Sequence, residues 1–171
     1  MKSISTEIKY AVIFTIASIA WQALGKALGF HDEKIASQLV FTSGFFVVAI
    51  AIYVMALLAK RKQLGGYATY GQLFLSGTLL GVFVAILSPI ATYLLLEVIS
   101  PNYLQNLSAY AVQQGEATPE IAATMFTLKS YIIQGVVGAV FAGLITSAVL
   151  SLFIKRTAPV RKESIAGTFQ D

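Results

Sequence analysis

Four polar side chains are spaced so that they could act together inside a membrane. Gln22 and Lys26 lie one helical turn apart near the end of the first long apolar segment. Glu97 lies near the end of the third such segment, and Gln134 lies near the start of the fourth. If these segments span a bilayer, all four share one depth, so Glu97 could pair with Lys26 while the two amides add hydrogen bonds.

Two other interpretations of these four residues stay open. Each long side chain could reach the membrane surface separately, as Lys and Gln do near helix ends. A relay for protons or ions would be the third possibility, but no carboxylate lies at the centre of an apolar segment. The sequence therefore indicates either a polar cluster between helices or separate surface contacts, and it gives little support for a pump.

The remaining patterns point away from catalysis and metal binding. His31-Asp32-Glu33 surrounds the one histidine, but three consecutive residues fan out around a helix and do not face one ion. The sequence has no nucleophile-elbow pattern, no zinc-protease pattern and no pair of carboxylates at one depth of a span, and it has no Cys. We therefore expect a non-enzymatic protein with no cofactor and no metal.

The composition places these residues in a membrane protein. Of the 171 residues, 57% are hydrophobic and 12% are charged, which is about half the charged fraction of soluble domains. Segments long enough to span a bilayer run over about 8–28, 39–58, 73–99 and 130–154. The predicted fold is all-α: a polytopic four-helix bundle in one domain over residues 1–156, followed by a flexible cytoplasmic tail over 157–171.

The distribution of Lys and Arg predicts the topology. With a cytoplasmic N-terminus, nine cations fall on the inner side and three on the outer side, so both termini are expected in the cytoplasm. The cations are divided among three inner segments and form no single face, so we expect no nucleic-acid partner. A cleavable signal ending near Ala20 is a competing interpretation, but the apolar run continues to Leu28.

A basic loop joins the second and third predicted spans. Residues 60–74 read KRKQLGGYATYGQLF. The three cations that open it, Lys60, Arg61 and Lys62, are predicted to contact anionic lipid head groups. Gly65-Gly66 predicts a tight reversal because glycine accepts positive φ angles, and Thr69 is a predicted cap for the next helix.

This loop also resembles the central signature of a family of small bacterial membrane proteins, domain of unknown function forty-one ninety-nine (DUF4199). The signature positions are Gly65, Gly66, Tyr67, Tyr70 and Gly71. Pro101-Asn102-Tyr103, which opens the long loop after the third span, is similar to the family pattern as well. The resemblance implies four spans in the bacterial inner membrane, and it assigns no activity and no site residues.

Small residues recur every four positions in the last two spans. They are Gly77, Gly81 and Ala85 in the third span, and Gly135, Ala139, Gly143, Ser147 and Ser151 in the fourth. Such ridges allow close helix approach in lipid, so we expect the two spans to pack together, or one ridge to bind a second copy or a partner's helix. Pro89 is expected to kink the third span, with a gate as the alternative.

The outer loop over residues 100–129 is predicted to be helical. Apolar residues recur at helical spacing between Tyr103 and Ala111, and polar residues occupy the other face up to Gly115. This amphipathic helix is expected to lie on the outer surface or to cap the bundle. Recognition of an envelope ligand by this loop is the alternative.

Two functions follow from these features. The first is an accessory, scaffold or assembly subunit whose partners are membrane lipid and either a second copy or another membrane protein. The alternative is a small oligomeric transporter or channel in which the polar cluster lines a path. Transport predicts a polar cavity that continues across the bilayer, whereas a scaffold predicts a closed, dry core.

Overall fold

A computed structural model describes residues 4–157, in which helices are joined by short loops and no β-strand is present. The long helices are α1 (Ser5–Ala27), α2 (Gln38–Gln63), α3 (Tyr70–Tyr93) and α6 (Leu128–Ile154). The shorter elements are a 3₁₀ turn, η1 (Ile35–Ser37), a π-helix, η2 (Leu94–Ile99), and helices α4 (Tyr103–Gln113) and α5 (Pro119–Met125). The predicted all-α fold is confirmed, and the predicted tail lies outside the described residues from position 158 onward.

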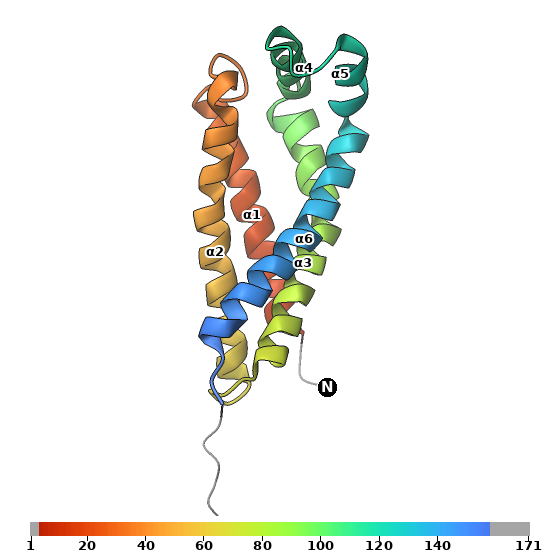
Figure 1. Ribbon diagram of the computed structural model, residues 1–171. Coiled ribbons are helices and arrows are strands. Elements are labelled where there is room, and N and C mark those ends of the chain that lie inside the picture. The colour runs from red at the N-terminus through yellow and green to blue at the C-terminus, as the bar shows by residue number, and fades with distance from the viewer. Residues whose placement is uncertain (1–3, 158–171) are drawn as a thin grey trace, which may run out of the picture.

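Within residues 4–157, four helices are long and apolar enough to cross a membrane, so the chain has the architecture of a multi-pass membrane protein. Figure 1 shows them side by side, with α4 and α5 at the end opposite the two ends of the described chain. We call these two ends of the molecule the α4–α5 end and the termini end. The predicted extra helix between the last two spans is present as α4, followed by the shorter α5.

Two of the long helices extend beyond the apolar runs predicted as spans, and α3 starts where the predicted Thr69 cap places it. Helix α2 continues past the apolar run to Gln63, so the basic residues 60–62 form its last turn. Helix α3 starts at Tyr70 because Thr69 and Gln72 form a capping box. The Thr69 hydroxyl accepts a hydrogen bond from the Gln72 N–H at 3.3 Å, and the Gln72 side chain accepts one from the Thr69 N–H at 3.0 Å. Reciprocal capping of this kind satisfies two backbone donors that the helix leaves free.

The loop between α2 and α3 is tied to the end of α6. Gly65 and Gly66 both have φ of +88°, the left-handed conformation that the reversal requires. Ala68 and Arg156 then exchange two backbone hydrogen bonds of 2.9 Å each. The Arg156 guanidinium also lies 5.7 Å from the centre of the Tyr67 ring, within the range of a cation–π contact. The loop therefore closes the termini end.

Helices α3 and α6 pack through their small residues. A Cβ built on Gly143 would lie 2.8 Å from the Gly81 Cα, so the two backbones touch at this point. Gly77 faces the Ser147 side chain in the same way one turn along, and Ala85 is buried on the same ridge. Close backbone approach of this kind is how helices associate in lipid. The ridge of α6 is thus used within the chain from Gly143 to Ser147.

The three largest fully buried apolar side chains lie in the termini half of the molecule or near its middle. Leu57, Leu73 and Leu80 are at most 1% exposed. Leu57 and Leu73 form one cluster with Ala68 and Ile154, beside the basic loop. Leu80 packs in a second cluster with Tyr53, near the middle of the spans. The apolar core therefore fills the termini half and reaches the centre of the membrane.

Candidate functional site

A cavity of about 450 Å³ opens between the helices toward the α4–α5 end. Its walls come from α1, α2, α3, the π-helix and α6. Figure 1 shows α2 and α6 meeting at the termini end and diverging toward the α4–α5 end. The polar residues that line the cavity are Thr15, Ser18, Gln22, Thr42, Ser88, Thr92 and Gln134. Two of the four residues in the predicted polar cluster, Gln22 and Gln134, therefore line the same cavity.

Polarity changes with depth along this cavity. Helix α1 starts at the termini end, so Phe14 lies about 12 Å deeper than Gln22 at 1.5 Å per residue. Helix α6 runs the opposite way, and Ala142 lies about 12 Å deeper than Gln134 for the same reason. Phe14, Ala142 and Val84 line the deep part, whereas the two amides lie near the mouth at the α4–α5 end. The cavity is therefore amphipathic.

The hydroxyl groups in the wall are mostly engaged with their own helices. Thr15 donates to the Ala11 carbonyl at 2.9 Å, and Ser18 donates to the Thr15 carbonyl at 2.8 Å. Hydroxyls that donate in this way keep their lone pairs free to accept a hydrogen bond. The amide N–H groups of Gln22 and Gln134 supply donors. The wall therefore offers neutral donors and acceptors.

The charged residues of the predicted cluster lie outside the cavity, and the predicted pair between Glu97 and Lys26 is wrong. Lys26 binds Asp32 at 2.5 Å, in the loop that follows α1. Glu97 is exposed on the π-helix and forms no ion pair with another described residue. Asp32 lies only six positions from Lys26 along the chain. Lys26 therefore pairs with this neighbour and not with Glu97 on another helix. No formal charge lines this part of the membrane interior.

One wall of the cavity owes its shape to Pro89. Proline has no N–H to donate to the carbonyl four residues earlier, which here belongs to Ala85. The Ser88 hydroxyl donates to that carbonyl at 2.9 Å instead, so α3 continues without an orphaned acceptor. The helix then widens into the π-helix from Leu94 to Ile99, and Leu95 of that segment lines the cavity. π-Helical turns of this type are frequent at functional sites.

A buried histidine joins α4 to the loop after α1 at the α4–α5 end, beside the cavity. His31 is fully buried, and its Nε2 lies 3.3 Å from the Gln22 Oε1. The Asn106 amide of α4 donates to the His31 carbonyl at 2.9 Å and to the Asp32 carboxylate at 3.1 Å. The Tyr103 ring, also on α4, lies 4.5 Å from the imidazole. These contacts, which we call the His31 latch, fasten α4 to the loop after α1 and orient Gln22.

Burial lowers the pKa of His31 below its ordinary value, with Asp32 opposing the shift and Lys26 adding to it. The geometry agrees with this direction. A neutral ring that donates from Nε2 to Gln22 leaves only a lone pair on Nδ1, and Nδ1 is buried without a partner among the described residues. Protonation would place an N–H there with no acceptor. The latch therefore favours neutral histidine.

At the termini end, one ion pair joins three helices inside the bundle. The Glu7 carboxylate of α1 lies 2.8 Å from the Lys60 Nζ of α2. The Ser76 hydroxyl of α3 donates to the same Glu7 oxygen at 2.6 Å. Glu7 is 2% exposed and Lys60 is 8% exposed. The second Glu7 oxygen is buried with no hydrogen-bond partner in the described part of the chain, so the carboxylate depends on Lys60 and Ser76.

This arrangement corrects the expectation that all of residues 60–62 contact lipid head groups. Lys60 points into the protein because Glu7 offers a buried counter-charge at the same depth. Arg61 donates to the last carbonyl of α6, that of Ile154, at 2.9 Å. Lys62 is exposed. Two of the three cations therefore tie helices together, and Lys62 keeps the exposure that a head-group contact requires.

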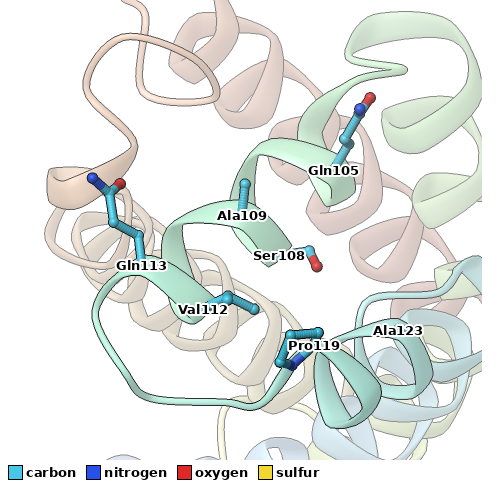
Figure 2. Close-up of a pocket in the computed structure, with 7 residues that line it drawn as sticks. All are labelled: Gln105, Ser108, Ala109, Val112, Gln113, Pro119 and Ala123. Atoms are coloured by element: carbon cyan, nitrogen blue, oxygen red, sulfur yellow. The ribbon is translucent and has the colours of Figure 1, made fainter.

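A second cavity of about 500 Å³ lies between α4 and α5. In Figure 2, Val112 and Pro119 face one another across it, while the amides of Gln105 and Gln113 point away. Thr118 caps α5 by accepting from the Ile121 N–H at 3.3 Å. No set of polar side chains converges on this cavity. We therefore interpret it as the gap between two short surface helices and not as a binding site.

Sequence reasoning missed the residues that hold the two ends. Lys60 was predicted at the inner surface, and Glu7 carried no prediction. The signal that could have joined them is one acid and one base at equal depth on neighbouring spans. His31 and Asn106 gave no such signal, because their contact depends on the path of the outer loop. Among residues 4–157, no group of three His, Cys, Asp or Glu side chains could hold a metal ion.

Comparison with known proteins places most of the chain in one family. The family model described as "Protein of unknown function (DUF4199)" matches residues 9–156. Neither the curated proteins nor the solved structures contain a match. The resemblance noted in the loop after the second span is therefore confirmed over nearly the full length of the chain.

Proposed function

The chain belongs to the DUF4199 family of proteins of unknown function, and from its geometry we propose that it is a non-enzymatic accessory, scaffold or assembly subunit of the bacterial inner membrane. The observation that carries this proposal is that the intramembrane cavity is blind. Its lining residues all lie in the half toward the α4–α5 end and at mid-depth. The termini half is filled by large side chains and by the buried pair of Glu7 and Lys60.

A blind, uncharged cavity fits a scaffold better than an ion path. An ion path needs polar or charged groups along its whole length. Here Lys26 pairs with Asp32 outside the cavity, and Leu57, Leu73 and Leu80 occupy the route to the other side. The core is nevertheless not closed and dry along its full length, since Gln22 and Gln134 face an open space.

Helix α6 supports a scaffold role through its two opposite ridges. One ridge packs on α3, as described above. The other carries exposed bulky side chains every four residues: Ile133, Val137, Phe141, Ile145, Val149 and Phe153. Helix α3 thus fixes one face of α6 and leaves the other to lipid or to a partner helix. A rigid helix pair with one free apolar face is suited to assembly within a membrane.

A small transporter is the second candidate, and the cavity itself is the feature that favours it. An open half and a sealed half together resemble one state of an alternating-access cycle. The opposite state would need α1, α2 and α3 to separate at the termini end. That movement would break the contact of Glu7 with both Lys60 and Ser76. Transport therefore makes the ion pair a gate, whereas the scaffold role makes it a fixed joint.

The charge distribution supports cytoplasmic termini in this proposal, because Lys and Arg are enriched at the termini end. Of the cations described there, Arg61 and Lys62 lie in the last turn of α2, and Arg156 follows the end of α6. The α4–α5 end would then face the periplasm. Surface labelling of single cysteines at exposed positions would test this orientation, and the chain helps by having no cysteine of its own.

The mass of the native complex tests the proposed role. The full chain would be extracted into nanodiscs from its own membranes and weighed by native mass spectrometry. We expect a second membrane protein at fixed stoichiometry. Replacing Phe141 and Ile145 on the free ridge of α6 by Ala should weaken that association, whereas replacing Val47 on the exposed face of α2 should not. A homo-oligomer alone, with solute flux in liposomes, would favour transport.

A further inference from the structure

We propose that the cavity between the α1/α2 and α3/α6 pairs binds a neutral membrane amphiphile: one acyl or isoprenoid chain with a hydroxyl or carbonyl head. This inference goes beyond the scaffold role and does not depend on it. The cavity volume of about 450 Å³ falls in the range of about 300–1,000 Å³ that small-molecule sites occupy. The proposal rests on the depth gradient, the charge and the access route.

The depth gradient matches a ligand with one polar end. Gln22 and Gln134 lie near the mouth, at the level where a lipid head group would sit. Phe14, Phe45 and Val84 line the deeper part, where a chain would lie. A few convergent polar groups above an apolar wall is the usual composition of a ligand site.

The charge of the wall selects a neutral head. The cavity lining contains amides and hydroxyls but no Lys, Arg, Asp or Glu. Lys26, the nearest cation along α1, is already bound to Asp32 at 2.5 Å. An anionic phosphate or carboxylate head would enter this wall without a counter-charge, which is costly at low dielectric. A hydroxyl or carbonyl head needs only the hydrogen bonds that the amides offer.

The His31 latch fixes the orientation of one of those amides, that of Gln22. His31 Nε2 lies 3.3 Å from the Gln22 oxygen, so the oxygen of that amide is engaged and its N–H groups remain as donors. Gln134 makes no side-chain hydrogen bond within residues 4–157. Both amides therefore present donors at the mouth that no described residue uses, and Gln134 is exposed there. A ligand carbonyl or hydroxyl oxygen would accept from them.

Access comes from the lipid rather than from water. Helices α2 and α6 meet in the termini half, where the Tyr53 hydroxyl lies near Gly143. Toward the other end they diverge, and Thr42 of α2 and Gly138 of α6 lie on separate walls. A Cβ built on Gly138 would meet no heavy atom within 4 Å. A chain could therefore slide in sideways from the bilayer.

The chain carries its own reporter for this site. Trp21 is the single tryptophan, and its ring lies 6.0 Å from the ring of Phe45, which lines the cavity. Bromine atoms on a lipid chain quench tryptophan fluorescence only at close range. The experiment uses the full chain in phosphatidylcholine nanodiscs and adds dibromostearyl alcohol, dibromostearate or dibrominated octadecane, with dibrominated phosphatidylcholine as the measure of bulk contact.

We expect the alcohol to quench Trp21 saturably at a mole fraction about tenfold below that of brominated phosphatidylcholine. Gly138→Leu fills the open space and should reduce quenching to the bulk level. Val137→Leu is the matched control, because Val137 is 47% exposed beside Gly138 and does not line the cavity. Gln134→Leu should weaken the alcohol about fivefold, the effect of one neutral hydrogen bond, and leave the octadecane unchanged.

Three outcomes would overturn the proposal. Quenching by the alcohol that rises linearly and equals that of brominated phosphatidylcholine would mean that no site exists. Tighter quenching by dibromostearate would mean that the head group is anionic. A partner protein that is retained in native nanodiscs and abolishes quenching would show that a helix occupies the space. The first two results are read from fluorescence alone and do not depend on whether the scaffold assay finds a partner.

Discussion

At the termini end the helices touch and charge is buried between them, whereas toward the α4–α5 end the helices separate and the groups between them are neutral. Glu7, Lys60 and Ser76 join three helices in the first region. Gln22 and Gln134 face an open cavity in the second. The two regions use the same four helices, so the difference comes from the side chains at each depth.

The small residues of α6 have two uses, one on the ridge that packs against α3 and one beside it. At Gly143 the missing side chain lets two backbones meet, since a Cβ there would lie 2.8 Å from Gly81. Gly138, five residues earlier, faces open space. Gly135 lies between these cases, because a Cβ would make ordinary contacts of 3.5 and 3.6 Å with Thr92 and Ser88. Small residues therefore form a seam at one depth and a cavity wall at another.

The largest expected effect comes from breaking the ion pair at the termini end. The Glu7 carboxylate is 2% exposed and pairs with Lys60. Lys60→Met removes this cation and leaves the buried carboxylate without a counter-charge. Removing one partner of a buried pair costs about 3–5 kcal/mol of folding free energy. Unfolding by denaturant in mild detergent, followed by circular dichroism at pH 8, would measure the loss.

Lys62→Met is the matched control, since Lys62 lies two positions further along and is exposed. The double variant with Glu7→Gln should regain part of the stability, because no unpaired charge then remains inside. Equal stability of the Lys60 and Lys62 variants would show that the buried pair does not hold this end together.

The next effect separates the two uses of the small residues on α6. Gly143→Leu forces α3 and α6 apart and should cost about 1–3 kcal/mol, the usual penalty of overpacking. Gly138→Leu should leave the unfolding midpoint unchanged or raise it slightly, because Leu is a better helix former than Gly and has room. The same unfolding assay compares the two. Equal losses at both positions would contradict a seam confined to the termini side.

A smaller effect is expected at the capping box of α3. Thr69→Ala removes the hydroxyl that accepts from the Gln72 N–H at 3.3 Å. Loss of such a cap costs about 1 kcal/mol. Thr118→Ala, at the cap of α5, is the comparison from the α4–α5 end and should cost less of the global stability, because α5 is a short surface helix. A greater loss of unfolding free energy for Thr118→Ala than for Thr69→Ala would mean that the α4–α5 end, and not the termini end, is the more stable half.

Much of this fold could be predicted from hydropathy and spacing alone. Runs of apolar residues located the four long helices, and Thr69 marked the start of α3. Pro89 was expected to disturb the third span, and the Ser88 hydroxyl was a suitable substitute donor for the freed carbonyl. These features are local, since each depends on residues within about one turn of helix.

The candidate site was harder to predict because it depends on which residues meet across helices. Lys26 and Glu97 were predicted at one depth, but depth does not tell in which direction each side chain points. Lys26 instead pairs with Asp32 in the loop that follows α1. The cavity arises where α2 and α6 diverge, and no residue type encodes that angle. Burial of Lys60 follows from the position of Glu7 on another helix. Sequence patterns therefore gave the depth of polar residues but not their partners.

The smallest predicted effect concerns pH and the His31 latch. Because burial lowers the pKa of His31 below 6.5, the unfolded chain binds this proton more tightly than the folded one does. The latch should therefore contribute its full stability above about pH 6.5, the unfolded value, and lose it as the pH falls through the lower folded pKa. Asp32 and Lys26 are the charged groups near the ring. Asp32 raises the pKa against the effect of burial, and Lys26 lowers it further.

Hydrogen exchange of α4 between pH 7 and pH 5 would detect this change, since Asn106 and Tyr103 hold α4 to the latch. We expect protection of α4 to fall with pH while α3 stays protected. His31→Gln, which keeps a neutral polar side chain, should remove the pH dependence of α4. If protection of α3 and α4 fell together, the α4–α5 end would not open on its own, and the two halves would behave as one cooperative unit.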